Sequence, residues 1–115
     1  MAIRLKRAYE APARGAGARI LVERLWPRGV KKEALALDLW LKDIAPSPGL
    51  RAWYGHEPSR FGGFVRRYRA ELEANATAVD ELRTWLRKGR ATFVYAARDD
   101  ERNSARVLRD WLLEG

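Results

Sequence analysis

The chain has 115 residues, a hydrophobic fraction of 47% and a formal charge of +8, which suit one folded domain and exclude a disordered chain. The absence of cysteine excludes disulfides and thiolate chemistry, and a single histidine, His56, excludes a histidine-rich metal site. The 23 basic residues suit an anionic partner, although solvated surface charge explains most of them. We expect one α/β domain over residues 1–115, with no metal and no cofactor.

The sequence predicts no membrane partner. No apolar run approaches the roughly 18 residues that a membrane helix needs. The first residues, Met1 to Arg7, enter a strand-like pattern without the apolar core of a signal peptide. We therefore expect a cytoplasmic protein.

Two short strands are predicted at the start of the chain. Apolar and polar residues alternate from Ile3 to Lys6, and the more apolar run from Arg19 to Leu25 forms the second strand. The connection from Tyr9 to Arg19 contains turn-forming proline and glycine. Because a parallel crossover normally takes about a dozen or more residues, a crossover and a local hairpin both stay open here.

The next segment fits two patterns. Leucine recurs at every second position from Leu35 to Leu41, which favours a strand over Asp38 to Ile44, but a helical stripe over the same residues fits almost equally well. Ser47 followed by proline is typical of a helix start. It predicts a short helix that ends near Gly55.

Two longer helices follow. One starts at Pro58 and has an apolar stripe from Phe61 to Leu72 at helical spacing. In the other, Thr77 and Asp80 resemble a capping pair, and Gly89 ends the helix.

The last unit is a strand, a loop and a helix. The nearly continuous apolar run from Ala91 to Ala97 is typical of a central strand covered on both faces. Asp99 or Asp100 is expected to cap the last helix, which would begin near Glu101. Because strands alternate with helical segments, we expect a single Rossmann-like domain with a small, mainly parallel sheet of about four strands covered by helices.

Two loops are candidates for a ligand site. In open α/β sheets, ligands collect at the carboxyl ends of strands, where loops lead into helix N-termini that favour anions. The first loop runs from Arg24 to Val30 and contains Trp26 and Arg28, and the second runs from Arg98 to Asn103. Together they could surround one anion. The alternative is structural, with Trp26 as a core anchor and Arg28 pairing with carbonyl or carboxylate groups.

The sequence offers one candidate for acid/base catalysis. His56 lies in a polar loop, and imidazole is the side chain best suited to transfer protons near neutral pH. A capping or hydrogen-bonding role is the structural alternative. The chain has no Gly-x-Gly-x-x-Gly fingerprint, no Walker loop and no nucleophile elbow. The motifs therefore predict neither a nucleotide site nor nucleophilic catalysis.

The chain resembles the YeaO-like branch of domain-of-unknown-function family 488 along nearly its whole length. The segments that carry the resemblance are Ile20 to Lys32, Trp40-Leu41-Lys42, Ala45-Pro46-Ser47, Leu50-Arg51, His56, Tyr68, Glu71-Leu72, Tyr95-Ala96-Ala97 and Asn103. The resemblance implies a strand over Asp38 to Ile44. It also implies shared polar positions, which fall on Arg24, Arg28, Lys42, Ser47, Arg51, His56, Tyr68, Tyr95 and Asn103.

Two departures from the family pattern argue against a fixed catalytic scheme. Relatives tend to have Asp where this chain has Glu23, and Asn-His where it has Asn103-Ser104. A mechanism that needs a second histidine cannot operate here.

Three hypotheses of function follow. The first is a site at the carboxyl ends of the strands for a phosphorylated or carboxylated small molecule, with catalysis open. The anion would be bound by Arg24, Arg28, Arg51 and Arg98, and His56 would act as the acid/base group. This hypothesis requires these side chains to share one pocket. The second is a nucleic-acid-associated module, suggested by the charge of +8. The third is a protein-interaction domain, which a large exposed patch around Trp40 or Trp53 would indicate.

Overall fold

The computed structural model describes residues 2–115 and is built on one four-stranded parallel sheet. The strands are β1 (Ile3–Arg7), β2 (Ala18–Leu21), β3 (Leu39–Trp40) and β4 (Ala91–Tyr95). Their order is β1-β4-β2-β3, and all three neighbouring pairs are parallel. The expected α/β architecture is confirmed, and a Rossmann-like layering is consistent with it.

The central strand is β4, and all five of its residues are buried. Phe93 and Tyr95 point into the larger apolar core, whereas Val94 belongs to a smaller core on the other face. This confirms the prediction of a strand covered on both faces, although the strand ends at Tyr95 and not at Ala97.

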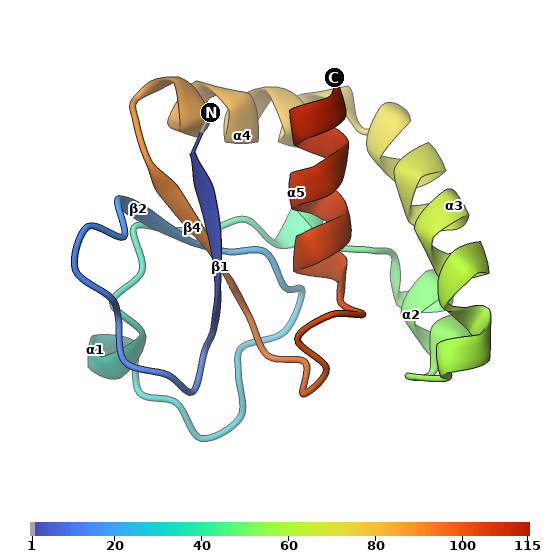
Figure 1. Ribbon diagram of the computed structural model, residues 1–115, viewed down its shortest axis with the longest axis horizontal. Helices are drawn as coiled ribbons and strands as arrows, with labels where there is room; N and C mark the ends of the chain where they lie inside the picture. Colours follow the sequence, from blue (N-terminus) through green and yellow to red (C-terminus); the bar gives the residue numbers. More distant parts are fainter. Residues whose placement is uncertain (1) are drawn as a thin grey trace.

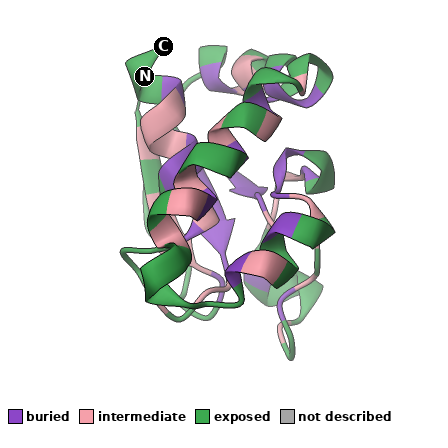
Figure 2. Cartoon of the chain, turned by 90° about the vertical axis from the view of Figure 1, so that its right-hand side faces the viewer, coloured by how far each residue is buried: buried purple, intermediate pink, exposed green. Residues whose placement is uncertain are grey.

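Helices cover the two faces of the sheet unequally (Figure 1). The helices are α1 (Lys32–Leu35), α2 (Pro48–Tyr54), α3 (Phe61–Glu73), α4 (Ala76–Arg87) and α5 (Ser104–Glu114). The last four supply the larger core, and Figure 2 shows exposed residues on their outer sides. The other face is covered by α1 and by the loop between β1 and β2. Within residues 2–115, no helix has the length and apolarity to cross a bilayer.

The connection between β1 and β2 is a crossover, so the hairpin alternative is wrong. Both strands run parallel to β4, which lies between them. Residues 8–17 make this crossover without a helix because the loop lies directly against the sheet. Thr92 Oγ1 donates to the carbonyl of Ala16 at 2.8 Å, and the N–H of Ala18 donates to the carbonyl of Arg90 at 2.9 Å. Gly17 sits at this close approach, with φ +68°.

Two predicted strands are shorter than expected. β2 ends at Leu21, although Val22 N–H still donates to the Val94 carbonyl at 3.2 Å, and the predicted extension to Leu25 is wrong. Of the strand expected over residues 38–44, only Leu39–Trp40 pairs. A 3-10 turn, η1 (Lys42–Ile44), follows, in which the N–H groups of residues 44 and 45 donate hydrogen bonds to the carbonyls three positions earlier.

The helix between residues 47 and 55 begins as the sequence predicts. Ser47 Oγ accepts from the N–H of Leu50 at 3.2 Å and caps α2, and Gly55 is its C-cap. The proline at 58 starts a 3-10 turn, η2 (Pro58–Arg60), that leads directly into α3.

The two other predicted caps are wrong. The helix α4 begins at Ala76 after Asn75, so Thr77 lies inside it. The cap of α5 is Asn103, whose Oδ1 accepts from the N–H of Arg106 at 2.8 Å, and not Asp99. Asp99 instead accepts the backbone N–H groups of residues 101 and 102 in the turn that precedes the helix.

We expect Gly17→Ala to destabilise the fold far more than Gly29→Ala does. A Cβ at residue 17 would lie 2.1 Å from the carbonyl oxygen of Arg90, whereas a Cβ at residue 29 would meet nothing within 4 Å. Both glycines have positive φ. Both alanine variants therefore lose about 1–2 kcal/mol of stability from the backbone conformation. The clash should add a loss of about 2 kcal/mol or more at residue 17 alone. Urea unfolding measures both, and equal losses would contradict the close approach.

Candidate functional site

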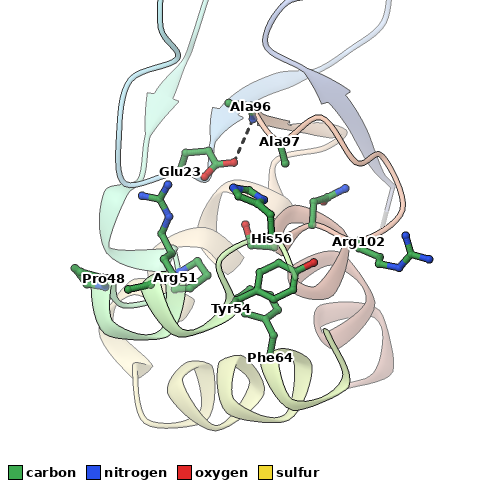
Figure 3. Close-up of a pocket in the computed structure, with 13 residues that line it drawn as sticks. Glu23, Pro48, Arg51, Tyr54, His56, Phe64, Ala96, Ala97 and Arg102 are labelled. Atoms are coloured by element: carbon green, nitrogen blue, oxygen red, sulfur yellow. Dashed lines mark hydrogen bonds between the residues drawn. The ribbon is translucent and has the colours of Figure 1, made fainter. Parts of the chain in front are cut away.

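A pocket of about 470 Å³ opens at the carboxyl ends of β2 and β4. Its polar side chains come from the segment after β2, from α2 and the turn that follows it, and from the loop that leads into α5 (Figure 3). They are Glu23, Arg51, Tyr54, His56, Arg102, Asn103 and Ser104. Parallel α/β sheets bind ligands at this edge, because loops and helix N-termini meet there.

Glu23 provides the negative charge of the pocket. Its Oε1 accepts from the N–H of Ala96 at 3.2 Å, which ties the ends of β2 and β4 together. Burial raises the pKa of the Glu23 carboxyl, while the Ala96 N–H, Arg51 and His56 act in the opposite direction. Its charged form is therefore costly in the absence of a ligand.

Arg51 is held in place by the packing of α2 against α3. Glu71 of α3 accepts from both the backbone N–H and the hydroxyl of Ser47, at 2.8 and 2.6 Å, at the point where α2 begins. One turn later, Arg51 extends its guanidinium toward Glu23 (Figure 3). The Ser47–Glu71 contact therefore orients a cationic side chain of the pocket.

His56 enters the pocket from an unusual backbone conformation. Its φ is +58°, in the left-handed region, directly after Gly55 at φ +52°. Residues other than glycine adopt this conformation at an energetic cost, and residues that are held in it cluster at functional sites. In Figure 3 the imidazole points toward Glu23 above the ring of Tyr54, 6.0 Å between ring centroids.

The loop before α5 closes the opposite side of the pocket. Asn103 is only 3% exposed, caps α5 and donates from Nδ2 to the Asp99 carbonyl at 3.0 Å. Arg102 pairs with the Asp99 carboxylate at 3.0 Å, and Figure 3 shows its guanidinium pointing away from Glu23. Backbone N–H groups of residues 102 and 101 hold the pKa of Asp99 below its usual range. The loop is thus fixed by its own hydrogen bonds.

Three of the residues proposed from the sequence meet in this pocket, namely Arg51, His56 and Asn103. Arg28 is exposed and does not line it, so the structure does not bring Arg28 and His56 together. Arg24 is also outside the lining, because its Nη2 donates to the Ala45 carbonyl at 3.3 Å.

Three further proposed residues have contacts elsewhere. Trp26 donates from Nε1 to the Val30 carbonyl at 2.7 Å and packs edge-on against Trp40. Lys42 lies over the Trp40 ring at 4.1 Å. Tyr68 is 1% exposed and donates to the Ile44 carbonyl at 2.7 Å, and burial raises its pKa.

Tyr95 and Arg98 line a different hollow. It lies at the ends of β1 and β4, and Arg7, Glu10 and Asp100 also line it. Burial raises the pKa of Tyr95, and the neighbouring carboxylates act in the same direction. The two loops singled out in the sequence therefore do not surround one anion.

Glu23 is the main residue that sequence reasoning did not propose as a site residue. The sequence feature that could have identified it is its position, because it is a carboxylate directly after the apolar run that ends at Val22, where a strand meets its loop. Tyr54 and Arg102 were also missed, and they have no comparable signal. Among residues 2–115, no group of three or more histidine or acidic side chains is arranged to hold a metal.

The tryptophans named for a protein-interaction patch are partly covered. Trp40 and Trp53 are half-buried, and Lys42 and Arg67 lie over their rings at 4.1 and 3.9 Å. Neither ring therefore forms a large exposed apolar patch.

Comparison with known proteins places the whole chain in one sequence family. A family model described as "Inactive DUF488-N3 subclade" matches residues 2–115. The uncharacterized protein YeaO of Escherichia coli is 42% identical over 112 residues, which cover 97% of each chain. The uncharacterized protein Rv3073c of Mycobacterium tuberculosis is 42% identical over 110 residues, 96% of this chain and 92% of the relative. No solved structure matches. The resemblance inferred from the sequence is confirmed.

We expect Glu23→Gln to stabilise the protein increasingly as the pH rises. A raised folded-state pKa means that the contribution of Glu23 to stability is fully present below the usual glutamate pKa and is lost as the pH rises through the folded value. Glutamine carries no such charge. The advantage of the variant should grow between about pH 4 and about pH 7, measured by urea unfolding.

The matched control for this effect is Glu81→Gln, at an exposed position of α4. It should show no comparable trend with pH. A Glu23→Gln variant that loses stability relative to wild type as the pH rises would contradict the cost of burying this charge.

We expect His56→Gly to be more stable than His56→Ala by about 1 kcal/mol. Both changes remove the imidazole, so they differ only in how well the residue tolerates φ +58°. Thermal unfolding of the two variants measures the difference. Equal stability would show that residue 56 does not hold a left-handed conformation in solution.

Proposed function

The chain belongs to the inactive DUF488-N3 subclade, and we propose that it binds an anionic small molecule in the pocket at the carboxyl ends of β2 and β4. The ligand would carry a phosphate or carboxylate group and at least one hydrogen-bond donor. The proposal favours binding without turnover, because the family description calls the subclade inactive. In this role His56 is a hydrogen-bond partner of the ligand.

The observation that carries the proposal is the convergence of Arg51 and His56 on Glu23 (Figure 3). Arg51 and His56 supply donors for an anionic group, and guanidinium is well suited to oxyanions. The carboxylate of Glu23 accepts a hydroxyl or ammonium donor from the same molecule. Such a donor would also offset the cost of burying the Glu23 charge.

The size and composition of the pocket support a small metabolite. Its volume of about 470 Å³ lies within the range of roughly 300–1,000 Å³ of small-molecule sites. Tyr54 and Phe64 give it an apolar wall, and their rings pack 4.7 Å apart. The first turn of α5, at Ser104, adds a helix N-terminus that favours anions.

A thermal-shift screen with sugar phosphates and hydroxycarboxylates tests the proposal, followed by calorimetric titration of the compounds that stabilise the protein. We expect Arg51→Gln to weaken binding about tenfold or more, because it removes a charge-assisted hydrogen bond. Arg87→Gln is the matched control. It removes the same charge from an exposed position in the last turn of α4, outside the pocket.

The control variant should keep the wild-type affinity. Equal weakening in both variants would show that only the net charge matters, which would contradict a specific site. A screen in which no phosphate or carboxylate compound stabilises the protein would also contradict the proposal.

A further inference from the structure

A second pocket, of about 380 Å³, lies beside the edge strand β1 and shares no lining residue with the candidate site. Its charged side chains are all basic. They are Arg4, Lys6, Arg19 and Arg109, and no aspartate or glutamate lines it. This pocket is therefore strongly cationic, and the proposed function does not use it.

Arg19 gives this pocket its most unusual feature. The residue is only 4% exposed, and its Nε donates to the Leu35 carbonyl at 3.0 Å. The nitrogens Nη1 and Nη2 have no hydrogen-bond partner within residues 2–115. The Asp38 carboxylate accepts the backbone N–H of Arg19 at 2.8 Å, and its charge partly opposes the effect of burial, which lowers the pKa of Arg19, but it forms no salt bridge with the guanidinium. A buried charge without a paired counterion is costly unless something else compensates it.

The strand register brings a second arginine close to Arg19. Arg4 of β1 and Arg19 of β2 both align with Thr92 of β4, so their side chains lie in one row on the same face of the sheet. Adjacent strands are about 4.8 Å apart, which puts the two Cα atoms about 10 Å apart. The hydroxyl proton of Thr92 is donated to the carbonyl of Ala16 and is not available elsewhere.

Lys6 adds a third positive charge on the same face, two residues along β1 from Arg4. Arg109 contributes less, because its guanidinium donates to Asp110 at 3.1 and 3.2 Å. Like charges this close repel each other in a partly buried setting. An oxyanion between them would reduce this repulsion and give Arg19 a second negative partner besides Asp38.

We propose that this second pocket binds a small phosphate group, held between Arg4, Lys6 and the buried guanidinium of Arg19, whose terminal nitrogens have no hydrogen-bond partner among residues 2–115. Guanidinium and ammonium groups are the usual partners of phosphate oxygens. The pocket has no aromatic residue in its lining, so it offers no stacking surface for the bases of a nucleic acid. A free phosphate or a phosphorylated small molecule therefore fits it better than a nucleic-acid backbone.

Titration of the wild-type protein with inorganic phosphate, at constant ionic strength set with chloride, tests this proposal by amide NMR. We expect saturable shifts at Arg4, Arg19 and Thr92. The double variant Arg4→Gln/Lys6→Gln should weaken binding about tenfold or more, because two charge-assisted contacts are lost. Arg66→Gln/Arg87→Gln is the matched control, since it removes two exposed helical charges outside both pockets and should bind as the wild type does.

Arg19→Met tests the buried charge, and it should abolish the shifts at Thr92. If that variant does not fold, the double variant on the pocket rim still decides the matter, because Arg4 is exposed and Lys6 is partly exposed. The absence of saturable shifts in this pocket, or equal weakening in the control, would overturn the proposal.

Two further experiments identify the pocket that binds the anion and the kind of ligand that the protein binds. Phosphate shifts that disappear in Arg51→Gln and persist in Arg4→Gln/Lys6→Gln would place the anion in the candidate site and overturn the second pocket. Shifts that persist in Arg51→Gln support it whatever the outcome for the first site. A single-stranded oligonucleotide that binds here where inorganic phosphate does not would also overturn the proposal.

Discussion

The sheet depends on β4, because this strand pairs with both β1 and β2 and is buried along its whole length. Its apolar side chains face a helical core on one side and a smaller core on the other. The position of β4 also forces the chain to pass from β1 to β2 across it. That passage brings Gly17 against the carbonyl of Arg90, where a side chain would not fit.

The strand β2 carries a buried or partly buried charge near each of its ends. Arg19 lies near the start of β2, and Glu23 lies just beyond its carboxyl end. Neither charge forms a salt bridge within residues 2–115, and each lines a pocket. Because burial penalises a charge that has no salt-bridge partner, both positions cost stability, and a ligand that pairs with either charge would lower that cost. This shared cost links the two binding proposals to one strand.

The proposal of binding without turnover rests on the family description, which calls the subclade inactive. The pocket itself holds one histidine beside one carboxylate. Arg51 depends on the start of α2, where Glu71 holds Ser47. Asn103 is used mainly to begin α5. These hydrogen bonds therefore maintain the geometry of the pocket, as the proposed binding site requires.

The sequence by itself determined the alternation of strands and helices, the burial of the strand that starts at Ala91 and the cap at Ser47, because these follow from local periodicity and backbone hydrogen bonding. It also pointed to Arg51, His56 and Asn103. Only the tertiary structure decided that β4 lies between β1 and β2, that Glu23 faces His56, and that Arg28 and Arg98 lie elsewhere. Strand order and the direction of loop side chains depend on packing between distant segments, which local sequence patterns do not encode.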